Sequence, residues 1–389
     1  MINILLFVLY LLISHVDYEV DGIRTTIKED MELEKQFKLL NKSPIKTINT
    51  EFGDIIDCID IFKQPALDHP LLKDHKLQRK LNFQNRIEKL NVNNSRVTSI
   101  FGLGKDECPT NTVPIMRITK DDLIRKKSVS NDHILVKDLP GVHLAEVSIP
   151  SLFGPYYGIS GRNAIYNPQV HTKSQISMSH LWIQNGPTKF TNKISAGWHV
   201  VPQLYGDYST RFYTSWTTDN FKKTGCYNIL CAGFVQTSKE IYLGAPLGQP
   251  SVYGGPTYDF SQSISQDPVT KNWWIHVKRK FIGYFPAKLF TNMSSANEVG
   301  WGGRTRTASG TLSPQMGSGH LPDGNCSHSG YFRKVTIEGV KRIPYGPEIF
   351  QASSFTDKPN CFGVKYFGFL GPKFGNLIQF GGPGGNCGN

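Results

Sequence analysis

Apolar and polar residues alternate in short runs over most of the chain, from about residue 140 to residue 389. Two clear runs cover residues 176–183 and 273–277. Because side chains alternate between the two faces of a strand, such runs predict β-strands. Glycine, proline and asparagine separate most of the runs, as turns separate antiparallel strands. We therefore expect a mainly β fold, with an antiparallel β-sandwich over residues 139–389.

The region 23–138 has a different pattern. Leu33, Phe37 and Leu40 fall on one face of a short helix, and Pro44 prevents its continuation. Together with the signals described next, this pattern predicts a smaller mixed α/β domain that precedes the sandwich.

Residues 53–61 alternate apolar and acidic side chains, as a half-buried strand does. Thr119 and Asp122 have the spacing of a helix N-cap. Residues 125–138 are charged and polar, so we expect an exposed linker. A processing enzyme could cut after the basic residues at its start, or these residues could simply form a solvated helix end; the sequence leaves both open.

An almost wholly apolar run covers residues 2–13. It is too short to span a bilayer and fits the core of a signal peptide, with cleavage after Gly22 and a segment 1–22 that is removed. No later segment is apolar enough for a membrane helix. We therefore expect a secreted protein with no membrane attachment after signal removal. Secretion would place the seven cysteines in an oxidising compartment.

Four Asn-x-Ser sequons are candidate glycosylation sites. They begin at Asn41, Asn93, Asn292 and Asn325, and a proline after the first weakens it. The net charge of +12 favours contact with acidic polymers such as cell-wall pectin. No nucleic-acid motif accompanies the charge, so we do not expect nucleic-acid binding.

The segment 193–200, KISAGWHV, is followed by Pro202 and by LYGD at 204–207. These words resemble the neprosin family of plant secreted prolyl endopeptidases of the glutamic type. Further matching words include TGCYN at 224–228 and QMGSGH at 315–320. The resemblance implies two large bent antiparallel sheets with an active cleft across one concave face. It also implies that the region 23–138 is an activation peptide with its linker.

Both positions that carry a catalytic glutamate in this family carry another residue here. The first glutamate precedes Ala-Gly-Trp, where this chain has Ser195; the second follows Trp-Gly-Gly, where it has Arg304. Glutamic peptidases need two facing carboxyl groups, one of which acts as a base on water. A serine hydroxyl is not basic enough, and a guanidinium has no acceptor site. We therefore assign no catalytic residue.

Two replacements for the lost acids can be considered. Glu298 lies on the same strand as Arg304 but roughly 20 Å along it, which is too far, and Glu146 lies in an unrelated segment. Ser195 could act as a nucleophile only with an activating base. His199 is about 13 Å away along the strand, whereas His320 follows a Gly-Ser-Gly turn and could reach the cleft in three dimensions. We favour a structural role for both Ser195 and His320.

Arg304 and Arg306 would make the cleft cationic and able to bind a peptide carboxylate or an acidic sugar. Alternatively, Arg304 is tied to a local acid such as Asp207, and the sequence does not decide between the two. Trp198 and Trp301 flank the two substituted positions in the motifs, so the resemblance makes them the expected cleft walls.

The resemblance also implies three disulfides, which leave Cys326 unpaired. They join Cys58 to Cys108, Cys226 to Cys231 and Cys361 to Cys387. Neither a metal-binding motif nor a cofactor motif is present.

The sequence thus predicts a secreted, catalytically inactive relative of glutamic peptidases, located in the cell wall or apoplast. It would bind a peptide, an acidic wall polysaccharide or an active relative with which it competes. The alternative is an active prolyl endopeptidase with a rearranged site, and a third possibility is a structural wall protein held by its charge.

Overall fold

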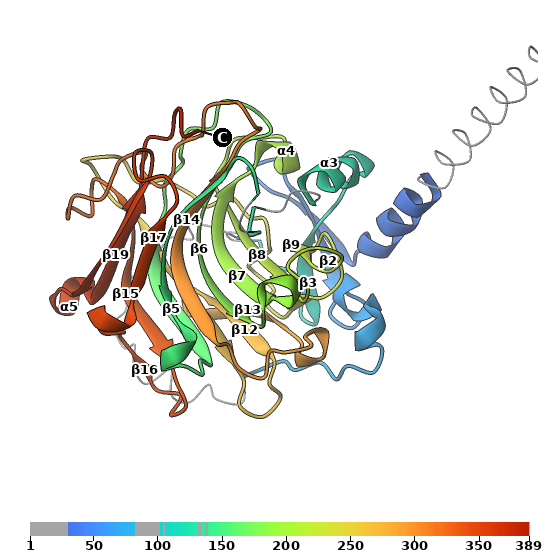
Figure 1. Cartoon of the computed structure of the whole chain (residues 1–389). Helices are drawn as coiled ribbons and strands as arrows, with labels where there is room; N and C mark the ends of the chain where they lie inside the picture. The colour runs from blue at the N-terminus through green and yellow to red at the C-terminus, as the bar shows by residue number, and fades with distance from the viewer. Residues whose placement is uncertain (1–29, 82–101, 104–105, 131–133, 137–138, 389) are drawn as a thin grey trace, which may run out of the picture.

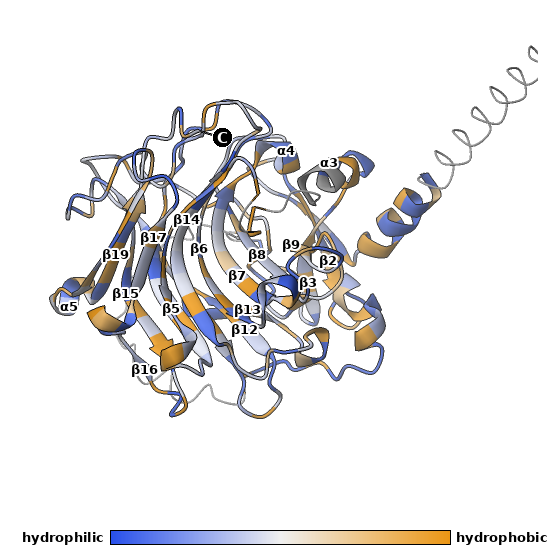
Figure 2. Ribbon diagram, in the orientation of Figure 1, coloured by the Kyte–Doolittle hydropathy of each residue, from blue (hydrophilic) through white to orange (hydrophobic). Residues whose placement is uncertain are grey.

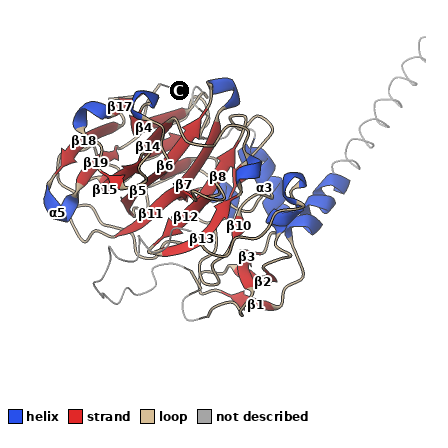
Figure 3. Ribbon diagram, turned by 90° about the horizontal axis from the view of Figure 1, so that it is seen from below, coloured by secondary structure: helices blue, strands red, loops and turns tan. Residues whose placement is uncertain are grey.

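The computed structural model describes residues 30–81, 102–103, 106–130, 134–136 and 139–388. The expected signal peptide and the sequon at Asn93 lie outside these residues. Two large antiparallel sheets pack face to face, and a small sheet lies beside them (Figures 1 and 3). The predicted mainly β fold is confirmed. Every helix in the described part of the chain is too short or too polar to cross a membrane.

The first large sheet has seven strands in the order β17-β4-β14-β6-β7-β8-β9. Their bounds are Ser353–Thr356 (β17), Val142–Ile149 (β4), Glu298–Arg306 (β14), Ile176–Asn185 (β6), Asn192–Val200 (β7), Arg211–Thr217 (β8) and Cys226–Tyr227 (β9). Every residue of β7 is buried, so this central strand has no solvent-exposed face. Figure 2 shows hydrophilic and hydrophobic residues interspersed along the strands of both large sheets.

The second large sheet has nine strands, with the path β10-β13-β12-β11-β5-β15-β19-β18 and β16 paired to β15. Their bounds are Val235–Gln236 (β10), Lys280–Phe285 (β13), Trp273–Val277 (β12), Asp259–Gln266 (β11), Gly158–Ala164 (β5), Gly330–Glu338 (β15), Asn376–Gly381 (β19), Gly363–Phe369 (β18) and Pro344–Tyr345 (β16). Long strands with antiparallel neighbours bury a continuous apolar layer between the two sheets.

Two tryptophans span the interface between the large sheets. The indole N–H of Trp198 donates to the Ala164 carbonyl at 2.8 Å, and that of Trp301 donates to the Ser160 carbonyl at 3.0 Å. Both side chains are fully buried. The expectation that they wall a cleft is therefore wrong, because both point into the core. Each lies three residues from its substituted position, and an odd offset places a side chain on the opposite face of a strand.

The N-terminal region forms its own three-stranded sheet. Its strands are β1 (Lys46–Asn49), β2 (Ile55–Asp60) and β3 (Thr112–Met116), in that order. The strand predicted for residues 53–61 is β2. Residues 30–40 are helical, as the spacing of apolar residues predicts.

The helix α3 (Lys120–Ser130) begins at the predicted cap. The Asp122 backbone N–H donates to the Thr119 hydroxyl at 3.1 Å, and the Thr119 N–H donates to the Asp122 carboxylate at 2.7 Å. The remaining helices α4 (Pro202–Tyr205) and α5 (Gly371–Phe374) are single turns. Short 3-10 turns cover Pro65–Asp68, Pro70–Leu72, Ser151–Phe153, Thr188–Phe190, Ala287–Leu289 and Ile349–Gln351.

The segment after α3 differs from the exposed linker that the sequence predicts. Ile134 and Leu135 are buried and belong to the main hydrophobic core. Their two apolar side chains lie within a charged stretch, and burial of such side chains stabilises the docked position of the segment.

Three disulfides join the cysteines that the family resemblance pairs. They are Cys58–Cys108, Cys226–Cys231 and Cys361–Cys387, and Cys326 is free and half-buried.

Candidate functional site

The face of the seven-stranded sheet that points away from the second sheet carries a row of buried polar side chains. We call this row the polar face. It comprises Glu146 on β4, Arg304 on β14, His180 on β6, Ser195 on β7 and Tyr213 on β8. Glu146 is 4% exposed and the others are fully buried. Buried polar groups are costly unless they are hydrogen-bonded, so their partners define what this face can do.

Arg304 makes a two-point contact with Glu146 on the neighbouring strand. Its Nε lies 2.5 Å from Glu146 Oε1 and its Nη2 lies 3.0 Å from Oε2. The third nitrogen, Nη1, donates to the backbone carbonyl of Ile134 at 3.2 Å. The Arg304 guanidinium therefore links β14 to β4 and also binds the segment that contains Ile134, which covers the polar face.

A chain of hydrogen bonds continues from Glu146 across the sheet. His180 Nε2 lies 2.8 Å from Glu146 Oε1, and the Tyr213 hydroxyl lies 3.1 Å from His180 Nδ1. On the neighbouring positions of β7 and β8, the Ser195 hydroxyl lies 2.8 Å from that of Ser215. An ionised carboxylate only accepts hydrogen bonds, so Nε2 of a neutral His180 carries the proton and Nδ1 accepts from Tyr213.

Burial and charge set the protonation states along this chain. Burial lowers the pKa of His180 to about 4, against the opposing hydrogen bond to Glu146. Burial disfavours the Glu146 carboxylate, but Arg304 and His180 outweigh it and hold the pKa of Glu146 well below its ordinary value. Burial also raises the pKa of Tyr213. At neutral pH the polar face thus holds one positive and one negative charge that neutralise each other.

The structure decides between the two alternatives for Arg304. It is locally paired, as one alternative held, but its partner is Glu146 rather than Asp207. The expectation of a cationic cleft at Arg304 fails because the Glu146 carboxylate cancels the guanidinium charge at 2.5 Å. Arg306, two residues further along β14, is half-buried at the end of the strand.

Neither histidine considered as a base for Ser195 contacts it. His199 stacks on the Tyr213 ring with centroids 4.4 Å apart, and its Nε2 lies 2.9 Å from the Tyr205 hydroxyl. His320 lies in the connection between β14 and β15, is exposed, and stacks on Tyr253 with centroids 3.7 Å apart.

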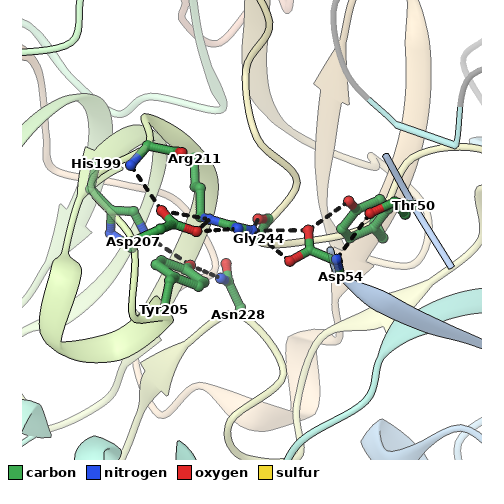
Figure 4. A network of polar contacts seen from close by, with 10 residues as sticks. Thr50, Asp54, His199, Tyr205, Asp207, Arg211, Asn228 and Gly244 are labelled. Carbon is green, nitrogen blue, oxygen red and sulfur yellow. Dashed lines mark hydrogen bonds and ion pairs between the residues drawn. The ribbon is translucent and has the colours of Figure 1, made fainter. Parts of the chain in front are cut away.

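A second polar network joins strand β8 to the N-terminal region (Figure 4). Arg211 on β8 lies between Asp207 and Asp54, with Nη2–Oδ2 at 2.5 Å to Asp207 and Nη1–Oδ2 at 2.9 Å to Asp54. The Tyr242 hydroxyl donates to Asp54 at 2.9 Å. Asp54 immediately precedes β2, so this contact fastens the small sheet to the sandwich.

The sequons occupy different surroundings. Asn292 and Asn325 are exposed. The Asn41 amide instead donates to the Ile118 carbonyl at 2.7 Å and accepts from the Ile118 N–H at 3.0 Å, so Asn41 is poorly placed for a glycan. In the described ranges, no group of three or more His, Cys, Asp or Glu side chains is placed to hold a metal ion.

Sequence reasoning missed Glu146, His180 and Tyr213. Each is an ionisable or hydroxyl-bearing residue inside a strand, but the sequence alone does not show which face of the sheet it occupies. A buried glutamate and a buried arginine on neighbouring strands of one sheet need partners of opposite charge.

Family profiles and solved structures show what this chain is similar to. The Neprosin family profile matches residues 173–383, and the Neprosin activation peptide profile matches residues 47–137. Among solved structures, scytalido-glutamic peptidase with a peptide-based transition state analogue is similar at 9% identity and a TM-score of 0.34, over 62% of this chain and 97% of that chain. SCP-B, an eqolisin peptidase in complex with the tripeptide Ala-Ile-His, is similar at 9% identity and a TM-score of 0.31, over 62% and 97%. Because the Neprosin profile covers more than half of the chain, this protein belongs to the Neprosin family.

Proposed function

We propose that this protein is a secreted, catalytically inactive member of the Neprosin family that acts by binding rather than by hydrolysis. One observation carries the proposal. Arg304, which the resemblance to the family motif places at the position of the second catalytic glutamate, has its guanidinium buried in a two-point contact with Glu146. A permanently charged donor in that position can neither activate a water nor protonate a leaving nitrogen.

The residues around Arg304 support loss of activity rather than a rearranged site. Glu146 is the carboxylate nearest to the substituted position, but its oxygens already accept from Arg304 and His180. Its lowered pKa also makes it a weak base and removes it as an acid at neutral pH. The lone pair on His180 Nδ1 faces Tyr213, so His180 does not take a proton from Ser195 directly.

A peptide ligand on the polar face would have to displace the segment that contains Ile134. That segment already offers a backbone carbonyl to Arg304 at 3.2 Å. A bound peptide could present a carbonyl in the same place, and Glu146 would keep the charge balanced. Competition for peptides with an active relative is the role that follows from this arrangement. Secretion and a place in the cell wall or apoplast remain parts of the proposal.

The test is an assay of the purified protein on proline-containing peptides between about pH 2 and 8, with an active family member as the positive control. We expect no turnover, and no release of the N-terminal region when the protein is incubated alone at acidic pH. Turnover that Ser195→Ala or Arg304→Ala abolishes would establish the alternative, a working peptidase with a rearranged site.

A further inference from the structure

A groove on the outward face of the nine-stranded sheet, on the far side of the molecule's core from the polar face, combines cations with hydroxyl groups. Two adjoining hollows of about 940 and 570 Å³ share Arg162 and Arg333. We call the two together the arginine groove. A Cβ atom added at Gly161 would contact Trp301 and Phe332, so this position of β5 faces the core. Side chains alternate along a strand, so the neighbouring Arg162 points outward.

Arg162 and Arg333 lie directly opposite each other on the neighbouring strands β5 and β15. Like charges in this position destabilise a sheet. Asp259 compensates in part: Arg162 Nη2 lies 2.6 Å from its Oδ1, and Arg333 Nε lies 2.5 Å from its Oδ2. One carboxylate between two guanidinium groups leaves a net charge of about +1.

Each guanidinium keeps hydrogen-bonding capacity beyond Asp259. Arg162 uses Nε and Nη2 for Asp259, and Arg333 uses Nε for Asp259 and Nη1 for the Lys373 carbonyl. Within the described residues, Arg162 Nη1 and Arg333 Nη2 have no hydrogen-bond partner, and both side chains line the groove. Two preoriented donors of this kind suit a carboxylate or a sulfate.

Two further cationic residues line the groove, and both have a positive backbone φ angle. Lys334 has φ +52° within a bulge of β15, and Arg279 has φ +68° in the tight turn between β12 and β13. This left-handed region favours glycine, asparagine and aspartate, and long side chains there carry strain. The bulge and the turn therefore present cations at sites where local backbone preference would select other residues.

The neutral lining of the groove favours a sugar over a peptide. Hydroxyl groups of Ser160, Ser261, Ser263 and Thr336 line its floor. The strands β5 and β11 beneath it are paired on both sides, so they offer no free edge for a peptide to join as an added strand. Burial raises the pKa of Glu338, at one end of the groove, to about 7, so this carboxylate repels an anionic ligand little at mildly acidic pH.

From this arrangement we infer that the arginine groove is a binding site for an acidic oligosaccharide, with Arg162 and Arg333 holding a carboxylate or sulfate and the serine and threonine hydroxyls holding sugar hydroxyls. The site is independent of the polar face and of whether the protein hydrolyses peptides.

The test measures binding of the full-length protein to defined oligosaccharides by calorimetry. The probes are an oligogalacturonate, a sulfated oligosaccharide, a neutral oligosaccharide of equal length and an oligoglutamate. The double variant Arg279→Gln/Lys334→Gln removes two exposed charges that hold no buried partner. The matched control Lys222→Gln/Lys223→Gln removes the same charge from the exposed loop between β8 and β9. Because Asn325 borders the groove, each protein is measured before and after enzymatic deglycosylation.

We expect the oligogalacturonate or the sulfated sugar to bind, with affinity about tenfold weaker in the groove variant and unchanged in the control. Which of the two binds more tightly identifies the anionic group. Equal losses in the groove variant and the control would overturn the proposal, because net charge alone would then account for binding. The proposal would also be overturned if oligoglutamate or the neutral oligosaccharide bound as tightly as the acidic oligosaccharides. The groove would then not be specific for an acidic sugar.

Discussion

The pairing of Arg304 with Glu146 predicts a large and specific loss of stability when Arg304 is removed. Arg304→Met keeps an apolar stem but leaves the Glu146 carboxylate, 4% exposed, with only neutral His180 as a partner. Breaking one side of a buried pair costs about 3–5 kcal/mol. At about 2 °C per kcal/mol for a domain of this size, the melting temperature should fall by about 6–10 °C. Arg306→Met, on the same strand but half-buried, should cost about 1 kcal/mol or less.

A double-mutant cycle separates this effect from lost packing. If the charge pair is responsible, Glu146→Gln together with Arg304→Met should recover most of the stability lost in Arg304→Met alone, because no buried charge then remains. Thermal and urea unfolding of the four proteins gives the coupling energy. A cost below about 1 kcal/mol for Arg304→Met, or additive effects of the two substitutions, would refute our account of the polar face.

Two further predictions concern acid and the attachment of the N-terminal region. Burial lowers the pKa of His180 to about 4 and that of His199 to about 3, so the unfolded chain takes up protons below about pH 6.5 that the folded protein does not. The free energy of unfolding should therefore fall by about 1.6 kcal/mol per histidine between pH 6.5 and 5. His199→Phe should flatten this dependence when unfolding in urea is measured at several pH values. Parallel pH curves for the two proteins would contradict the assignment. Asp54→Asn removes one of the two carboxylates on Arg211 and should weaken docking of the N-terminal region by about 1.5–3 kcal/mol. The assay is limited proteolysis followed by size exclusion, which measures how much of the N-terminal region separates from the sandwich. We expect more release in Asp54→Asn than in the control Glu51→Gln, which changes an exposed residue. Equal release in the two variants would show that the ion pair does not fasten the region.

Local patterns in the sequence predicted those parts of the fold that depend on neighbouring residues. The alternation over residues 53–61 predicts β2, and Thr119 with Asp122 predicts the start of α3, because each depends on residues a few positions apart. The partner of Arg304 lies 158 residues away on β4 and could not be found from spacing.

The position of the tryptophans, by contrast, was within reach of the sequence. Trp198 is three residues from Ser195, and Trp301 is three residues from Arg304. Because side chains alternate between the two faces of a strand, each tryptophan lies on the opposite face of the sheet from the substituted residue of its motif. In the family motif each tryptophan lies close in sequence to a substituted position, but the two-residue period of a strand decides to which face of the sheet its side chain points. The burial of Ile134 and Leu135 could not be inferred, because nothing near them in the chain shows which surface they cover.

The three disulfides determine what a single backbone cut can achieve. Cys58–Cys108 closes a loop wholly within the N-terminal region, and the other two bridges lie wholly within the sandwich. A protease that cuts between residues 58 and 108 produces two fragments that stay covalently joined. A cut between residues 116 and 139 leaves no covalent link between the N-terminal region and the sandwich. The basic residues Arg125 to Lys127 lie in this second interval, so one cleavage there would turn the three-stranded N-terminal sheet into a dissociable subunit, while the segment that contains Ile134 and covers Arg304 would stay attached to the sandwich.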